Sequence, residues 1–199
     1  MHLRAGRNAL VEWLPLETIV FDGADAQSTV KVDCADARAS PAGEIIAYGR
    51  RASREQFRNG RFRQAIEIRR GDKLLWAEYG EVHGADPLFD SPIGYAGRAV
   101  SGLFWLARSG RRTRSRRATT TTTTAHHETL QANDLQAGVT RLPGGIMLAR
   151  CLGDSTEQVR DHLLRDLEGL AAGYARRGQR HCHACGRPDR DELSVRQDN

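Results

Sequence analysis

RFRQAIEIRRGDKLLWAEYGEV (residues 61–82) is the stretch that decides the fold class. Side chains alternate along its first half, and the less polar face carries Phe62, Gln64, Ile66 and Ile68. Arg and Glu side chains occupy most of the opposite face, which is typical of a strand with one solvated side. Gly71-Asp72 then supplies a turn, and LLWAEYGEV alternates again. The stretch therefore predicts a β-hairpin.

Further strands are indicated on both sides of this hairpin. Residues 10–48 contain short β-branched and aromatic runs separated by turn formers, namely LVEWL, ETIVF, STVKVDC and EIIAY. Residues 138–152 predict two strands around a Pro-Gly-Gly turn, whereas residues 83–104 are dense in Gly, Pro and Asp and indicate tightly bent backbone. These patterns predict that the chain as a whole is mainly β.

One helix is predicted to begin after Asp154. Ser155 with Gln158 three residues later matches a capping box. Apolar side chains then recur at helical spacing, and Gly178 is a plausible end. Such a stripe is either core or a partner-binding face, and the residues assigned to partner binding are Leu163, Leu167, Leu170 and Tyr174.

Composition divides the chain into four parts. We expect a β scaffold over residues 1–107 and a strand pair with a helix over residues 138–178. The stretch between them, residues 108–137, is rich in Arg and Thr and is expected to form a loop, because it offers little apolar surface to bury. The polar tail, residues 179–199, is expected to be disordered.

Nucleic-acid binding is disfavoured by the charge distribution, despite a net charge of +5. The excess comes from one local tract, whose basic residues are Arg108, Arg111, Arg112, Arg114, Arg116 and Arg117. A nucleic-acid-binding fold normally distributes its basic residues over folded elements. No apolar run reaches the length of a membrane span, and the N-terminus has no signal-peptide pattern, so we expect a soluble, cytoplasmic protein.

Cysteine and histidine residues offer one weak metal-binding alternative. The tail donors are His181, Cys182, His183 and Cys185, which could hold zinc or nickel. No second CxxC completes a structural zinc site, and the adjacent pair His126-His127 would point in opposite directions in a strand. The sequence shows no phosphate-binding loop, nucleophile elbow or HExxH pair, so we expect no enzymatic activity and no tightly bound cofactor.

Four stretches taken together resemble one family, the urease accessory protein D family, also called H. They are EWLPLETIVFDGA (12–24), GRFRQAIEIRRGDKLLWAE (60–78), DPLFDSPIGYAGRAVSG (86–102) and GVTRLPGGIMLARCLGDS (138–155). The resemblance implies mostly antiparallel strands in a flattened β-helical scaffold with one or two C-terminal helices. It also implies a chaperone role in nickel insertion, in complex with accessory proteins F and G, of which G is the GTPase, and with apo-urease. Because family members have a long β segment before the EWLP motif, the chain is expected to be truncated at its N-terminus.

The resemblance further implies an internal passage for nickel(II) in transit. Carboxylates can supply weak, exchangeable oxygen ligands for such an ion. The acids within the matched stretches are Glu17, Asp22, Glu67, Glu78, Asp86 and Asp90. From pattern alone each could instead be an ordinary exposed strand or turn residue, and by the alternation of the hairpin Glu67 and Glu78 would be solvated. Both possibilities stay open at this stage.

Overall fold

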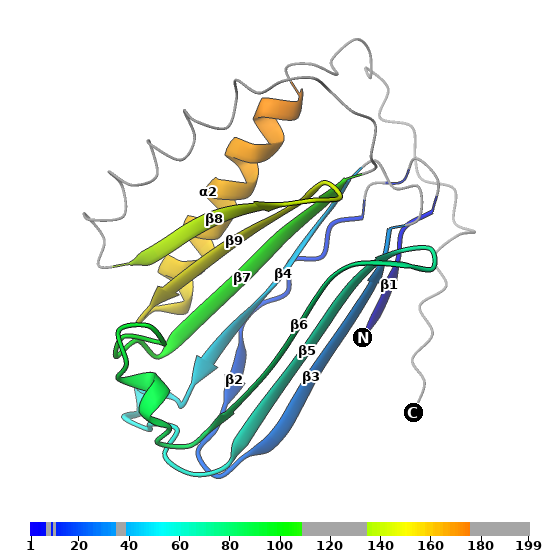
Figure 1. Ribbon diagram of the computed structural model, residues 1–199. Coiled ribbons are helices and arrows are strands. Elements are labelled where there is room, and N and C mark those ends of the chain that lie inside the picture. The colour runs from blue at the N-terminus through cyan, green and yellow to red at the C-terminus, as the bar shows by residue number, and fades with distance from the viewer. Residues whose placement is uncertain (7–8, 10, 35–38, 109–134, 176–199) are drawn as a thin grey trace, which may run out of the picture.

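A computed structural model describes residues 1–6, 9, 11–34, 39–108 and 135–175, with side chains of the helix described up to Asp166. The strands form two sheets that lie face to face (Figure 1). The first sheet has the order β1-β3-β5-β6, with β1 (His2–Arg4), β3 (Asp25–Asp33), β5 (Arg61–Arg70) and β6 (Lys73–His83). The second has the order β2-β4-β7-β9-β8, with β2 (Thr18–Val20), β4 (Ala39–Tyr48), β7 (Val100–Arg108), β9 (Ile146–Gly153) and β8 (Gln136–Leu142).

The first five strands wind alternately between the two sheets. As a result β1, β3 and β5 pair in parallel in one sheet, and β2 pairs in parallel with β4 in the other. This winding agrees with the predicted flattened β-helical scaffold, and the mainly β fold is confirmed. The sheets are mixed, because a chain that returns to the same sheet after crossing to the other runs parallel to its earlier strand. Antiparallel pairing begins with β5–β6 and continues through β4–β7, β7–β9 and β8–β9.

Apolar side chains between the sheets form the main core. Ile66 and Ile68 of β5 face Trp105 of β7 and Ile146 of β9, and all four are almost completely buried. A second group, around Tyr48 and Phe62, fills the space near the chain turns that connect the sheets. The predicted hairpin is confirmed as β5–β6, and its less polar face is the one that packs against the second sheet.

Strand β7 lies in the middle of the second sheet, yet the sequence pattern did not predict it. Its residues show no period-two alternation because both of its faces are covered. Leu103 and Trp105 pack toward the first sheet, while Val100 and Phe104 pack toward the helix. Of the predicted stretch LVEWL, the structure shows an isolated bridge at Trp13 rather than a strand.

Helix α2 (Thr156–Ala175) covers the face of the second sheet that points away from the first (Figure 1). The predicted cap is present, since the Gln158 N–H donates to Ser155 Oγ over 3.4 Å. Val159 and Leu163 are fully buried against β7, where Gly102 leaves the necessary space: a Cβ at that position would lie 2.4 Å from Leu163 Cδ1. For Leu163 the partner-binding assignment is therefore corrected to core. The side chains of Leu167, Leu170 and Tyr174 lie outside the described residues.

Candidate functional site: a polar cleft between the sheets

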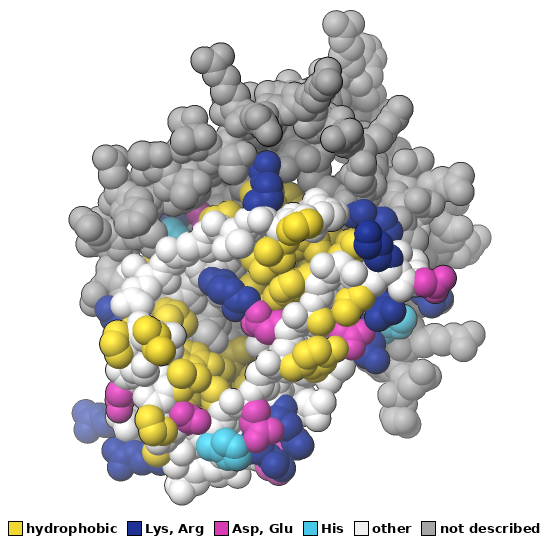
Figure 2. All heavy atoms as spheres, viewed as in Figure 1, with side chains coloured by type: hydrophobic (Ala, Val, Ile, Leu, Met, Phe, Trp, Pro, Cys, Tyr) yellow, Lys and Arg dark blue, Asp and Glu magenta, His cyan; other side chains and the backbone are white. Residues whose placement is uncertain are grey.

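A cleft of about 580 Å³ opens between the two sheets on the side where β6 and β8 form their edges. Strands β4, β5, β7 and β9 supply its inner wall, and the loop 88–95 forms one rim. Among the described residues that line it, the charged side chains are Glu44, Glu78 and Arg150. Basic and acidic side chains meet near the middle of this face, between groups of hydrophobic ones (Figure 2).

Glu44 is the most deeply placed of the three charged residues, with 6% of its surface exposed. It projects from β4 toward the first sheet, where Ser28 Oγ donates to its Oε1 over 2.5 Å and Gln64 Nε2 donates to its Oε2 over 2.9 Å. Both donors are neutral, and within the described parts of the chain Glu44 forms no ion pair. A buried carboxylate that lacks a cationic partner is costly to desolvate and attracts a cation.

Glu78 and Arg150 form an ion pair across the cleft, from β6 of the first sheet to β9 of the second. Arg150 Nη1 donates to Glu78 Oε1 over 3.0 Å, and Arg150 Nη2 contacts Glu78 Oε2. The side chain of Arg150 is 52% exposed and that of Glu78 is 29% exposed, so the pair lies nearer to solvent than Glu44. Glu78 faces inward because it pairs with the buried Ile66 in the β5–β6 register.

Sequence reasoning missed Glu44. The strand ASPAGEIIAY (39–48) contains this one charged residue, and apolar or small side chains occupy both of its alternating faces. A lone carboxylate in a strand that is apolar on both sides is the signal that could have identified it, because such a strand is expected to be buried on both faces.

The other predicted acids are distributed over separate parts of the surface. Glu17 lies before β2, with its Oε2 3.9 Å from Arg160 Nη1 of α2. Glu67 projects from the outer face of the first sheet and accepts a hydrogen bond from Tyr79 Oη over 2.7 Å, which lowers the pKa of its carboxyl group. The six predicted acids are therefore not brought together, and of the six Glu78 lies in the inter-sheet cleft.

Asp22 connects two loops rather than facing the interior. Its Oδ1 accepts hydrogen bonds from the backbone N–H groups of Asn59 over 2.7 Å and Arg58 over 2.8 Å. These bonds hold the pKa of Asp22 below its ordinary value of 3.8, and the bond from Asn59 has the largest effect. The exposed carboxylate thus fixes the turn after β2 against the loop that leads into β5.

Asp22→Asn is expected to lower stability more at neutral pH than in acid. Since the pKa of Asp22 is lower in the folded than in the unfolded chain, its contribution is complete above about pH 4 and is lost as the pH falls through the folded value. Urea-unfolding midpoints of wild type and variant at pH 7 and pH 3 should therefore differ more at pH 7. A difference independent of pH would contradict this role, and Asp90→Asn controls for loss of an exposed carboxylate.

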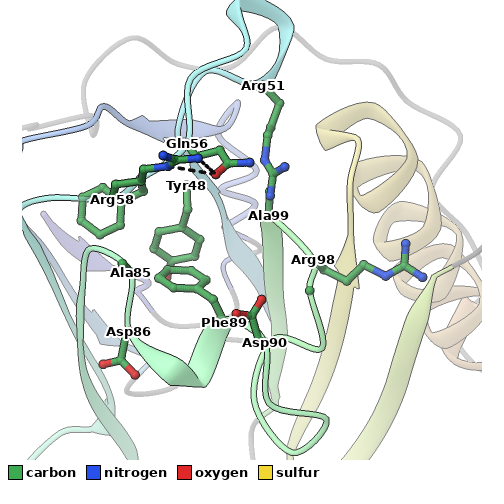
Figure 3. A pocket seen from close by; sticks show the side chains of 12 residues that line it. Tyr48, Arg51, Gln56, Arg58, Ala85, Asp86, Phe89, Asp90, Arg98 and Ala99 are labelled. Atoms are coloured by element: carbon green, nitrogen blue, oxygen red, sulfur yellow. Dashed lines mark hydrogen bonds between the residues drawn. The ribbon is translucent and has the colours of Figure 1, made fainter.

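A second cleft, of about 560 Å³, lies beside the loops that contain Asp86 and Asp90 (Figure 3). Asp86 caps the short helix η2 (Pro87–Phe89) by accepting from the Leu88 N–H over 2.8 Å, and Asp90 follows that helix at its other end. Tyr48 lines both clefts, and its hydroxyl lies 3.0 Å from that of Tyr95. Burial raises the pKa of Tyr48, so this group stays protonated and neutral.

A buried polar group also lies beneath α2, on the other side of the second sheet. His162 Nε2 lies 3.7 Å from Asp166 Oδ2, and both side chains are almost fully buried. Burial raises the pKa of the nearby Cys151 thiol to about 12, with a smaller contribution from the charge of Asp166. The thiol is therefore protonated at neutral pH and is not a ready metal ligand.

The alternative sites from the sequence fall outside the described residues. These are the tail donors His181, Cys182, His183 and Cys185, the pair His126-His127, and the arginine tract from residue 109 onward. In the described parts of the chain no group of three or more His, Cys, Asp or Glu side chains is positioned to hold a metal ion. Among the helical residues that the structure describes, none form a segment with both the length and the apolar character of a membrane span.

The comparisons with known proteins identify the family. A family model described as UreD urease accessory protein matches residues 1–182. The chain belongs to the UreD urease accessory protein family. It is 39% identical over 165 residues to the urease accessory protein UreD of Pseudomonas aeruginosa (strain UCBPP-PA14). The aligned region covers 82% of this chain and 54% of that protein. The predicted resemblance is thereby confirmed.

Relatives from other bacteria give the same result. The UreD proteins of Dechloromonas aromatica (36% identical over 161 residues) and Nitrosococcus oceani (36% over 152 residues) match 78% and 76% of this chain, and 52% and 48% of their own lengths. The chain thus spans about half the length of the curated UreD relatives it matches.

Proposed function

We propose that this chain acts in urease maturation as a non-catalytic chaperone and offers the inter-sheet cleft to nickel(II) on its way to apo-urease. Membership of the UreD family supports the role in urease maturation. The observation that carries the nickel step is Glu44, a buried carboxylate with two neutral donors and no ion pair among the described residues. We further propose accessory proteins F and G as its partners, in keeping with the resemblance, and a cytoplasmic location.

Weak binding suits a protein that must release its metal. Two carboxylates and the side-chain amide of Gln64 provide oxygen ligands, whereas nickel is held more tightly by sites that include imidazole or thiolate. The cleft lining offers carboxylate, amide and hydroxyl oxygens in a space large enough for a partly hydrated ion. The ion would therefore pass through the cleft without a resident site.

Glu44→Gln is expected to lower the nickel content of urease several-fold. The amide has nearly the same shape as the carboxylate, but it carries no charge to attract the ion. The variant and wild type would be co-expressed with apo-urease and accessory proteins F and G, and the nickel in purified urease would be measured by mass spectrometry.

The matched control for this experiment is Glu81→Gln, which removes an exposed carboxylate of β6 that pairs with His83 outside the cleft. Co-purification of the partners shows whether each variant still assembles. Normal nickel content in urease matured with the assembled Glu44→Gln variant would refute the nickel role of the cleft.

A further inference from the structure

The second charged feature of the cleft, the Glu78–Arg150 pair, gives Arg150 a role of its own. We propose that the guanidinium of Arg150 is a resident counter-cation that a divalent metal ion must displace before it can enter the cleft. This inference rests on the proposed function, because it assumes that a metal cation is the cargo.

The charges that line the cleft favour exchange of the Arg150 guanidinium for a metal ion over addition of the ion beside the guanidinium. With Arg150 in place, the charged residues that line the cleft in the described parts of the chain are two carboxylates and one guanidinium, so their sum is −1. Without the guanidinium the sum is −2, which equals the charge that one divalent ion neutralises. A monovalent cation would leave this charge only half balanced, so the exchange favours divalent ions.

The position of Arg150 permits this exchange. Its side chain is 52% exposed and lies on β9, next to the edge strand β8, so rotation about its side-chain bonds can carry the guanidinium into solvent. Ion pairs at this degree of exposure contribute little stability, because water and salt screen them. Glu44, in contrast, is held by Ser28 and Gln64 and stays in the cleft.

The order of binding follows from the exposure of the two carboxylates. Glu78 is 29% exposed and meets the ion first, whereas Glu44 is 6% exposed and lies deeper between the sheets. While Arg150 neutralises Glu78, the outer carboxylate is a weak ligand. Arg150 therefore lowers the affinity of the cleft for metal and helps the ion to leave again.

The test is a nickel(II) titration of the full chain in competition with a chromophoric chelator. Nickel bound by the tail donors would hide binding in the cleft. All proteins in this titration therefore carry four substitutions in the tail, namely His181→Ala, Cys182→Ser, His183→Ala and Cys185→Ser. In this background Arg150→Gln is expected to bind nickel at least about tenfold more tightly, about 1.4 kcal/mol in binding free energy. Arg150→Lys, which keeps the positive charge, should stay close to wild type.

Two further variants make the result specific. Arg150→Gln combined with Glu78→Gln should lose the gain, because the outer carboxylate is then absent. Arg61→Gln is the matched control: Arg61 also forms a two-bonded pair, with Asp25, but on the outer face of the first sheet, so nickel affinity should not change.

The proposal is overturned if folded Arg150→Gln binds nickel no more tightly than wild type, which would make the pair a structural link between the sheets. It is also overturned if the gain persists in the double variant. Since this titration contains no urease, its outcome is independent of the Glu44→Gln maturation experiment: normal delivery by Glu44→Gln would refute the proposed function, whereas an unchanged affinity of Arg150→Gln refutes the exchange alone.

Discussion

Leu163→Asp is expected to lower the free energy of unfolding by about 4 kcal/mol or more, enough to unfold much of the chain at room temperature. Leu163 has no exposed surface and packs with Val159 against the second sheet. An aspartate there would bury a charge at a position where apolar atoms surround it. Urea unfolding followed by circular dichroism measures the loss.

Leu164→Asp is the matched control, because it introduces the same charge at the next, partly exposed position of α2. Leu164→Asp should lower the free energy of unfolding clearly less than Leu163→Asp does. If instead Leu163→Asp folded as stably as wild type and lost only the binding of accessory protein F, the apolar stripe would be a partner surface at this residue, contrary to the packing described above.

Trp105→Ala is expected to lower the free energy of unfolding by about 3–5 kcal/mol. Trp105 is fully buried in the centre of the core between the sheets, close to Ile66, Ile68 and Ile146. Removal of the indole would leave a large cavity that the surrounding strands cannot close, because hydrogen bonds to both neighbours hold β7 in the middle of its sheet. Denaturant midpoints followed by circular dichroism give the change without relying on the lost fluorophore.

Trp105→Phe, which keeps most of the apolar volume, should lower the free energy of unfolding much less than Trp105→Ala. Trp13→Ala provides a comparison at a partly buried tryptophan outside the regular strands. Equal losses for Trp105→Ala and Trp13→Ala would contradict the assignment of the main core to the space between the sheets.

The sequence predicted those elements whose faces differ in polarity. The hairpin β5–β6 has one solvated and one buried face, so its alternation was visible, and the cap at Ser155 marked the start of α2. Strand β7 was missed because both of its faces are buried, which removes the alternation on which the prediction relied. The parallel pairing of β3 with β5 was also missed, since strand direction depends on long-range topology that local patterns do not contain.

The predicted acids do not gather at one place in the structure, although one of them, Glu78, lies in the cleft. The acids in the matched stretches were expected to supply oxygen ligands to nickel in transit. In the structure Asp22 fixes a turn and Glu67 faces outward. Burial on the inner face depends on register: Glu78 turns inward because it is paired with Ile66, and its partner Arg150 lies 72 residues further along the chain. Glu44 was missed because it lies outside the four matched stretches from which the candidate acids were taken.

Paramagnetic nuclear magnetic resonance tests the central claim most directly, namely that the cleft between the sheets receives nickel at Glu44. Nickel(II) would be added in substoichiometric amounts to the isotope-labelled chain with its tail donors replaced. We predict that the side-chain amide signal of Gln64, which donates to Glu44 over 2.9 Å, broadens, and that it stays sharp in Glu44→Gln. The amide of Gln27, on the outer face of the first sheet, should stay sharp throughout. A sharp Gln64 signal while other residues broaden would contradict the account.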